Sequence, residues 1–534
     1  MGSFTILLCL QFLILLNVAI INCKPNILFI LSDDQDVTIG GLKPMAKTKK
    51  LITEKGLTFT NAFASTPICC PSRSSILTGL YLHNHGVVNN SLHNCSSSLW
   101  QNGPELRTYA TYVKKQNYMT FYAGKYLNQY GFIKAGGVKH IPAGWDHWYG
   151  LVGNSRYYNY TLSVNGKAET HGDHPRRDYL TDVINRRATK FLDRYNPETD
   201  KPFLMVLATP ACHSPFTPSP KYKNAFPNVK APRTKNFNIT SHDKHWLLRQ
   251  THPLKDFVVD KIDDIYRNRW RTLLSVDDMV ENMINLLEKK DIINNTYIFY
   301  SSDHGYHLGQ FSLPMDKRQL YEMDVRIPLM VRGPGIPINK TSKSPIVSID
   351  FAPTFIELAG GQPEKMDGIS MVPLLHSDSN FRKDWKRDFL IEYVGEGKNT
   401  PVPGCPTLAQ GGVNNCFPDC ICEDAFNNTY SCIRTLSQSG TNKIYCEFKD
   451  NEHFVEMYNM KVDPMQLKNL AICSKEKKSC LNKFHKNPND EVEKSSRHDK
   501  ITKARNYAIV TSFIYPIHLT WGIQTVTSAT EPCQ

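Results

Sequence analysis

Residues 69–79 read Cys-Cys-Pro-Ser-Arg-Ser-Ser-Ile-Leu-Thr-Gly. Pro71 suits the first turn of a helix, because its fixed φ matches the helical value and its missing N–H needs no partner there. We therefore predict a helix over residues 71–77, with Cys69 at its N-terminus. Free N–H groups and the helix dipole make such a position favourable for an anion. Taken alone, the cysteine pair is equally compatible with half of a disulfide or with buried apolar side chains.

Four short apolar runs predict the strands of a sheet. They cover residues 26–31, 119–123, 203–207 and 297–300. Continuous apolar runs of this length are typical of strands buried on both faces, as in a parallel sheet between helices. Residues 272–289 repeat apolar positions at about the 3.6-residue helical period and predict one of those helices.

Polar residues follow each of these runs. They are Asp33, Asp34, Lys125, His213, Asp303 and His304. Ligands of parallel α/β sheets bind beyond the carboxyl ends of the strands, so these side chains are candidates for one site. Two adjacent acids more often form a turn or cap a helix. Their place directly after an apolar run is what favours a functional reading of Asp33 and Asp34.

With its Pro-Ser-Arg and Leu-Thr-Gly parts intact, the 69–79 stretch resembles the signature of the sulfatase family. In that family the first cysteine is oxidised during secretion to Cα-formylglycine. One hydroxyl of the hydrated aldehyde attacks sulfur, and the other later expels the sulfate. The match places the modified residue at Cys69, not Cys70, and implies a formylglycine-generating enzyme as a partner during secretion.

The resemblance also implies the fold. We expect an alkaline-phosphatase-like α/β domain over residues 24–380, with a central mixed, largely parallel sheet between helices. A smaller, cysteine-rich α+β domain would follow over residues 381–473. Residues 474–534 match no relative convincingly, so we leave this tail unassigned.

A metal site is implied by two further matches. Asp33-Asp34-Gln35 resembles the first metal-binding segment of sulfatases, and Ser302-Asp303-His304-Gly305 resembles the second. Hard oxygen ligands of this kind suit Ca²⁺ or Mg²⁺. The resemblance implies one Ca²⁺ held by Asp33, Asp34, Asp303 and the modified Cys69. His304 is an additional candidate ligand, because many sulfatases have Asn there and some have His.

The resemblance assigns catalytic roles to four cations. Arg73 would hold the modified residue, while Lys125 and Lys317 would contact the sulfate. His213, in a His-x-Pro segment, would donate a proton or a hydrogen bond to the leaving ester oxygen. Positive charge around the sulfate opposes the negative charge that develops on the bridging oxygen in the transition state.

One position departs from the family pattern. Many sulfatases carry a His two positions after the sulfate-binding lysine, but this chain has Leu127 there. The handling of the formylglycine hydroxyls would then need another group, and Asn128 is a candidate substitute.

Beyond the short motifs, the resemblance extends over about residues 25–470. Stretches such as Lys244–Trp246 and Cys416–Asp424 look like the lysosomal exosulfatases that act on 6-sulfated N-acetylglucosamine in heparan and keratan sulfate. The extracellular heparan 6-O-endosulfatases share the Asp-His pair of the second metal segment, but they carry a long basic insertion that is absent here. A phosphatase of the same fold, with Ser or Thr as nucleophile, and a non-catalytic glycan-binding homologue are further alternatives.

The N-terminus predicts entry into the secretory pathway. Residues 1–23 contain no Asp, Glu, Lys or Arg and form an interrupted apolar stretch, which favours a signal peptide. A membrane anchor usually needs about 20 predominantly apolar residues, so we expect none. The sequence also contains Asn-x-Ser/Thr sequons, which are at Asn89, Asn94, Asn159, Asn238, Asn294, Asn339 and Asn427. We expect a lysosomal enzyme, with secretion as the alternative.

The chain has 15 cysteines, and several crowd between residues 405 and 446. Because paired Cys-x-x-Cys elements and a His pair are missing, disulfides are a better interpretation than a zinc site. The formal net charge of +13 suits a polyanionic partner such as a sulfated glycosaminoglycan. No nucleic-acid-binding motif accompanies this charge, so nucleic acid is not an expected partner. Nothing in the sequence predicts an oligomeric state.

Overall fold

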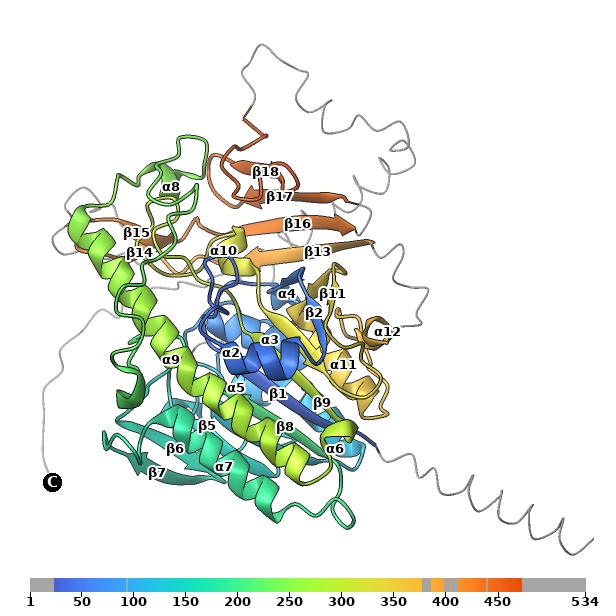
Figure 1. Ribbon diagram of the computed structural model, residues 1–534. Coiled ribbons are helices and arrows are strands. Elements are labelled where there is room, and N and C mark those ends of the chain that lie inside the picture. Colours follow the sequence, from blue (N-terminus) through green and yellow to red (C-terminus); the bar gives the residue numbers. More distant parts are fainter. Residues whose placement is uncertain are drawn as a thin grey trace, which may run out of the picture. The chain divides into compact units, whose positions relative to one another are not determined.

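The computed structural model describes residues 24–92, 95–376, 386–397, 405, 412–437 and 440–472 (Figure 1). The predicted signal peptide (1–23) and the unassigned tail (474–534) lie outside the described residues. So does the sequon asparagine Asn94. In the part of the chain that is described, no helix combines the length and the apolar character that crossing a membrane would require.

The centre of the fold is a ten-stranded sheet with the strand order β11-β2-β10-β9-β1-β8-β4-β5-β6-β7. The four predicted apolar runs form its middle, as β1 (Asn26–Ser32), β4 (Met119–Lys125), β8 (Phe203–Ala208) and β9 (Thr296–Ser302). Strand β1 pairs in parallel with both β8 and β9, and β4 pairs in parallel with β8. The predicted parallel centre is therefore confirmed.

The outer strands make the sheet mixed. On one side, β10 (Leu329–Arg332) runs antiparallel to β9 and is followed by β2 (Leu57–Phe59) and β11 (Lys340–Ser342). On the other side, β5 (His147–Leu151) is parallel to β4. The antiparallel strands β6 (Tyr160–Val164) and β7 (Lys167–His171) complete that side.

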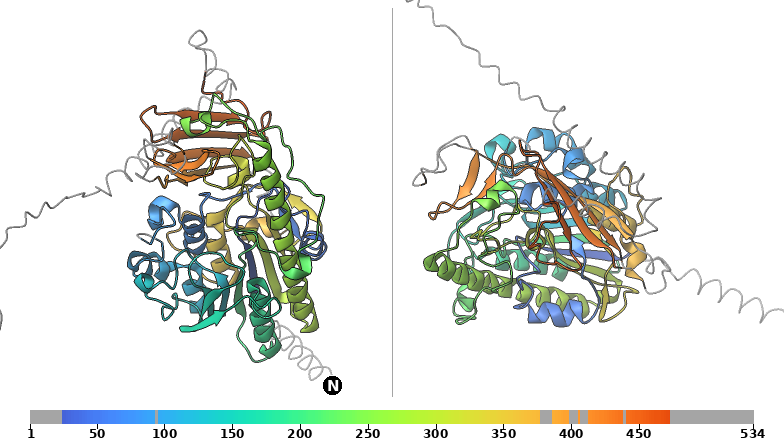
Figure 2. Two further views of the ribbon diagram at one scale, coloured as in Figure 1. Left: turned by 90° about the vertical axis from the view of Figure 1, so that its left-hand side faces the viewer. Right: turned by 90° about the horizontal axis from the view of Figure 1, so that it is seen from above.

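Helices cover both faces of the sheet (Figures 1 and 2). Side chains of β1 alternate between the two faces, as expected for a strand. Leu28 and Ile30 pack in one core cluster with residues of α7 (Leu180–Arg194) and α9 (Asp256–Lys289). Phe29, which points to the opposite face of the sheet, packs in a second core cluster.

That second cluster is built by residues of α6 (Tyr109–Lys115) and α11 (Phe351–Leu358), together with the end of α3 (Cys69–Thr78). Strands that supply apolar side chains to both faces need the continuous apolar runs that the sequence shows.

Helix α9 is longer than predicted. It has 34 residues and begins at Asp256, whereas the apolar pattern led us to residues 272–289. The missed N-terminal half packs Ile262, Ile265 and Tyr266 into a separate core cluster that also contains residues of the C-terminal region. The apolar side chains of the two halves of α9 therefore pack in different core clusters.

The C-terminal region is a smaller antiparallel sheet with the order β13-β16-β17-β18. Its strands are β13 (Lys386–Tyr393), β16 (Tyr430–Ser437), β17 (Asn442–Phe448) and β18 (Val455–Asn459). The hairpin of β14 (Val413–Cys416) and β15 (Cys422–Ala425) lies between β13 and β16 in the sequence. The boundary that we predict near residue 380 falls among residues that are not described and stays a prediction.

The crowded cysteines form disulfides, as predicted. The pairs are Cys405–Cys420, Cys416–Cys422 and Cys432–Cys446. The remaining short α-helices and strands of the described residues are α2 (Ala46–Thr48), α4 (Leu82–His85), α5 (Ser98–Gln101), α8 (Trp246–Arg249), α10 (Glu322–Val325), α12 (Val372–Leu375), β3 (Ala62–Phe63) and β12 (Ile346–Val347).

Candidate active site

Helix α3 begins at Cys69 itself, with Ile68 in extended conformation as its N-cap. Pro71 therefore occupies the first turn, as predicted. The helix stops at Gly79, whose φ of 70° lies in the left-handed region that glycine adopts without steric cost. Every residue of α3 is buried, so the N-terminus of the helix and Cys69 face the interior of the site.

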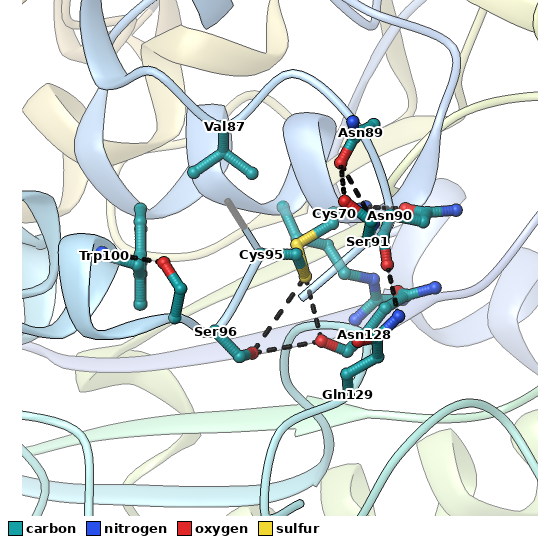
Figure 3. The surroundings of a disulfide bond; sticks show 12 residues. Cys70, Val87, Asn89, Asn90, Ser91, Cys95, Ser96, Trp100, Asn128 and Gln129 are labelled. Atoms are coloured by element: carbon teal, nitrogen blue, oxygen red, sulfur yellow. Dashed lines mark hydrogen bonds between the residues drawn. A yellow bond between two sulfur atoms is a disulfide. The ribbon is translucent and has the colours of Figure 1, made fainter. Parts of the chain in front are cut away.

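The neighbouring cysteine is committed elsewhere. Cys70 forms a disulfide with Cys95, and its backbone N–H donates to Asn90 Oδ1 at 2.8 Å (Figure 3). Among the described residues, Cys69 and Cys212 are the cysteines outside disulfides, and both are buried. The thiol that remains for modification in the motif is therefore that of Cys69.

The two acidic segments meet because their strands are neighbours. Strands β1 and β9 end in register at Ser32 and Ser302, so the residues that follow lie at the same edge of the sheet. The backbone N–H of Asp34 donates to Asp303 Oδ1 at 3.1 Å. Asp34 has a φ of 61°, a left-handed turn conformation that directs the chain across this edge.

Around Cys69 these acids form two overlapping groups of metal-ligand type. One group is Asp33, Cys69 and Asp303, and in it the ligand atoms lie within 4.8 Å of one another. The second group, with the same limit of 4.8 Å, is Asp34, Cys69 and His304. The Cys69 Sγ is the atom that the two groups share.

His304 points its Nε2 into this cluster. That atom lies 3.4 Å from Cys69 Sγ and 3.4 Å from Asp34 Oδ1. The other ring nitrogen, Nδ1, donates to the backbone O of Gly305 at 2.9 Å. Because this bond fixes the ring, Nε2 is the atom that His304 offers to a ligand or to Cys69.

Arg73 connects the two acidic segments. Its Nε donates to Asp303 Oδ2 at 2.8 Å and its Nη2 to Asp33 Oδ1 at 3.2 Å. A third bond runs from Nη1 to the backbone O of Lys125 at 2.9 Å. The guanidinium is buried and thus holds the acids and the lysine-bearing strand end in one arrangement.

Each acid of the Asp33–Asp34 pair contacts its own lysine. Lys125 Nζ lies 2.8 Å from Asp33 Oδ2, and Lys317 Nζ lies 2.8 Å from Asp34 Oδ2. Burial lowers the pKa of both lysines, but the acidic groups around each lysine together outweigh it and raise the pKa, so both ammonium groups stay charged. The largest of these acidic contributions is that of Asp33 at Lys125 and that of Asp34 at Lys317.

The same charges act on the acids. Burial raises the pKa of Asp33 and of Asp34, but the surrounding cations together outweigh it and hold both values below the usual range for aspartate. The largest of these cationic contributions is that of Lys125 at Asp33 and that of Lys317 at Asp34. Asp303 contacts Arg73 but neither lysine, and there burial dominates and raises the pKa. Asp33 and Asp34, which each contact a lysine, thus have a lowered pKa, whereas Asp303, which contacts none, has a raised pKa.

The pKa of Cys69 and the pKa of His304 shift in opposite directions. Burial raises the pKa of the Cys69 thiol, but Lys125 and Lys317 outweigh it and hold the pKa well below its usual range. Burial lowers the pKa of His304, but Asp303 and Cys69 outweigh it and raise the pKa to about 9. The site therefore favours negative charge at position 69.

His213 lies at the open side of the cluster, with 12% of its side chain exposed. Its Nδ1 donates to the backbone O of Ser214 at 2.6 Å, and its Nε2 lies 4.0 Å from Asp34 Oδ2. Burial lowers the pKa of His213, but Asp34 and Asp33 together outweigh it and raise the pKa. The structure thus brings together all nine residues that the sequence singled out.

Two further residues, Ser155 and Arg269, belong to this cluster and were missed. Ser155, from the loop after β5, donates to Asp33. Arg269 on α9 donates to the backbone O of Asp34 at 2.8 Å, and its guanidinium lies 4.1 Å from the ring centre of Tyr306. Arg269 lies in the half of α9 that the apolar pattern did not predict, and no motif marks Ser155.

The position that departs from the family pattern is part of the core. Leu127 is fully buried in an apolar cluster. The backbone O of Asn128 accepts a hydrogen bond from Ser96 Oγ at 3.1 Å, and Figure 3 shows Asn128 beside Cys95 and Ser96. Its Oδ1 is buried and has no hydrogen-bond partner among the described residues. A role of Asn128 at the formylglycine hydroxyls stays a prediction.

Comparisons with known proteins agree with this geometry. The sulfatase family profile matches residues 25–361. The N-acetylglucosamine-6-sulfatase of Capra hircus is 54% identical over 453 residues, which cover 84% of this chain and 80% of that protein. An extracellular sulfatase SULF-1 homolog of Drosophila melanogaster is 42% identical over 376 residues, which cover 70% of this chain and 33% of that protein.

A solved structure supports the fold. It is described as a complex with its substrate D-glucosamine-2-N,6-O-disulfate, and it matches with a TM-score of 0.67 at 22% identity, over 91% of this chain and 98% of that chain. The family profile and the 54% identity to a named sulfatase show that the chain belongs to the sulfatase family of sulfuric ester hydrolases.

Proposed function

We propose that the protein hydrolyses the 6-O-sulfate ester of N-acetylglucosamine 6-sulfate units in heparan sulfate or keratan sulfate. The observation that carries this proposal is the burial of Cys69 between three acids and two lysines, in a chain 54% identical to an N-acetylglucosamine-6-sulfatase. A sulfate ester is an anion, and its hydrolysis needs positive charge around the sulfate and a nucleophile at its centre.

The residues fit the two groups that this chemistry requires. Position 69 offers a buried, free cysteine at a helix N-terminus, the place where a formylglycine would arise. The carboxylates of Asp33, Asp34 and Asp303 are the hard oxygen ligands that Ca²⁺ prefers. When both are present, the formylglycine supplies the nucleophilic hydroxyl and the cation supplies charge that opposes the sulfate oxygens.

The remaining work falls to this chain's own side chains. Lys125 and Lys317 contact Asp33 and Asp34, and their position beside Cys69 supports a role of their ammonium groups in holding the sulfate. Arg73 keeps Asp33 and Asp303 in position and contacts the strand end that carries Lys125. These charges are buried, where electrostatic interactions are stronger than in water.

His213 is the group that serves the leaving sugar oxygen. Its Nδ1–H is committed to the backbone O of Ser214, so Nε2 is the atom that donates a proton. The raised pKa keeps the ring protonated at a higher pH than an ordinary histidine. Its partial exposure at 12% agrees with a group that meets the substrate at the entrance of the site.

We further propose that the enzyme reaches the lysosome through the secretory pathway, with secretion as the alternative. The named relatives, the described disulfides and the sequons support this proposal. The formylglycine-generating enzyme would then be the partner that modifies Cys69 on the way.

A 6-O-endosulfatase is the second candidate. The observation that favours it is the Asp303–His304 pair, together with 42% identity to an extracellular sulfatase. The higher identity of 54% to the N-acetylglucosamine-6-sulfatase of Capra hircus is why we prefer the first proposal.

One experiment tests the proposal directly. The purified protein should carry an aldehyde on the peptide that contains residue 69, and it should release sulfate from N-acetylglucosamine 6-sulfate. A fully modified protein without that activity would overturn the proposal. Cys69→Ala serves as the inactive reference.

A further inference from the structure

Lys317 stands on a chain segment that has little structure of its own. Residues 315–319 form no helix or strand, and a single bridge links Asp316 to His307. The next residue, Arg318, has a φ of 99°, in the region that side chains other than glycine rarely adopt. Such a backbone persists only where its surroundings hold it. Contacts from elsewhere must therefore fix the position of Lys317.

Several of those contacts come from the β14–β15 hairpin of the cysteine-rich region. Others come from Tyr430 on β16, whose hydroxyl donates to the backbone O of Arg318 at 3.0 Å, and from Asp324, which accepts the backbone N–H of Gln319 at 2.9 Å. Glu423 on β15 reaches both ends of the segment. Its Oε1 accepts the backbone N–H of Met315 at 3.1 Å, and its backbone O accepts a bond from Gln319 Nε2 at 2.8 Å. The other carboxylate oxygen lies 2.9 Å from His307 Nε2, and both side chains are fully buried.

Asp424, the next residue on β15, binds the side chain of Arg318, the residue with the positive φ. Arg318 Nη1 donates to Asp424 Oδ2 at 3.2 Å and to the hydroxyl of Tyr393 at 2.8 Å. The same Asp424 oxygen accepts the Tyr393 hydroxyl at 2.6 Å and the backbone N–H of Glu396 at 2.8 Å. The Arg318 side chain is thus anchored at a charged, buried point of the C-terminal region.

The other strand of the hairpin, β14, adds a contact on the solvent-exposed side. Asn415 on β14 is exposed, and its Nδ2 donates to Asp316 Oδ2 at 2.8 Å. A disulfide between Cys416 and Cys422 ties β14 to β15 at a register pair. The three residues Asn415, Glu423 and Asp424 are therefore carried by one covalently closed unit.

We propose that this hairpin is the template that positions Lys317 for the sulfate, with Asn415, Glu423 and Asp424 as positioning residues. The proposal rests on the proposed role of Lys317. Electrostatic stabilisation requires the ammonium group to be held close to the place where charge develops. A displacement of about 1 Å in a reacting arrangement lowers the rate by about 100-fold, so loss of the template weakens catalysis without removing a group that touches substrate.

The test uses the full chain and a double-mutant cycle. Asn415→Gly, Glu423→Gln and Asp424→Asn are each made alone and together with Lys317→Ala. Glycine is chosen at Asn415 because its φ of 50° is left-handed. Asn414→Ala, on the same strand, is the matched control. For each protein, kcat, KM, the inhibition constant of inorganic sulfate, the formylglycine content at residue 69 and the thermal midpoint are measured.

We expect Glu423→Gln and Asp424→Asn to lower kcat/KM by about 10- to 100-fold and to weaken inhibition by sulfate, at unchanged formylglycine content. Asn415→Gly should act in the same direction by about 2- to 5-fold, since it removes one exposed hydrogen bond. In the Lys317→Ala background the same changes should have little further effect, because residues that act through one group are not additive.

The outcomes distinguish the proposed role of Lys317 in holding the sulfate from the proposed role of the hairpin in positioning Lys317. Full activity of Lys317→Ala would refute the role of the lysine and with it the template. If Lys317→Ala is impaired but the hairpin variants lose the same factor in both backgrounds, or behave like Asn414→Ala, the template alone is refuted. If the buried variants fail to fold, Asn415→Gly decides, because it changes an exposed side chain.

Discussion

Lys317 Nζ lies 2.8 Å from Asp34 Oδ2, and the two residues are 283 positions apart in the chain. Asp33, the neighbour of Asp34, has the same relationship with Lys125. Two of the three acids that we propose as metal ligands are therefore also the partners of the lysines that we propose for the sulfate. A change at one acid must disturb both parts of the site.

Asp34→Asn tests this coupling. We expect turnover to fall by at least about 100- to 1000-fold, as when a group that stabilises the transition state is removed. Bound divalent cation, measured by elemental mass spectrometry, should fall from one per chain to a substoichiometric amount. Glu452→Gln, which breaks the exposed pair with Arg249, should change neither quantity. An active wild-type preparation with no bound divalent cation would show that the metal proposal is wrong.

Substitutions at the two cysteines should have different effects. Cys69→Ala removes the residue that becomes formylglycine, so activity should vanish while the protein is still secreted. Cys70→Ala opens the Cys70–Cys95 disulfide and should cost about 2–4 kcal/mol of stability, but some chains should still carry the aldehyde at residue 69. Peptide mass spectrometry locates the modification. An aldehyde on residue 70 would reverse the assignment.

The position of the sulfated sugar separates exosulfatase from endosulfatase action. In the proposed exosulfatase, a non-reducing-end sugar enters with its sulfate towards Lys125, His213 and Lys317, and the rest of the glycan points outward. Oligosaccharides that carry one 6-sulfate, either at the non-reducing end or inside the chain, should be desulfated faster at the end. Faster release from the internal position would exclude the exosulfatase proposal and leave the chemistry at Cys69 untouched.

His307 gives a prediction about pH and stability. Burial lowers the pKa of its imidazole, but Asp324 and Glu423 outweigh it and raise the pKa from 6.5 to about 10. Because the folded state binds this proton more tightly than the unfolded chain, the stabilisation is complete below pH 6.5 and is lost as pH rises towards 10.

The free energy of unfolding of wild type and His307→Gln, compared by urea titration at pH 6 and pH 9, checks this sign. The difference between the two proteins should be larger at pH 6. A difference that grows towards pH 9 would mean that His307 is neutral in the folded protein.

Much of the fold could be predicted from local patterns. The apolar runs at residues 26–31, 119–123, 203–207 and 297–300 became the central strands, because a strand covered on both faces needs apolar side chains at every position. Helix α9 shows the limit of this reasoning. Its apolar residues serve two different core clusters, so one continuous stripe does not describe the whole helix.

The sequence by itself determined the residue types of the site, their order along the chain and the place of Cys69 at a helix start. These features depend on short-range sterics, on apolar periodicity and on a motif of adjacent residues. Only the tertiary structure decided which partners meet. It paired Lys317 with Asp34, added Ser155 and Arg269, and set Glu423 and Asp424 around the Lys317 segment. Such contacts join residues that are far apart in the chain, and packing between elements, which no local pattern encodes, selects them.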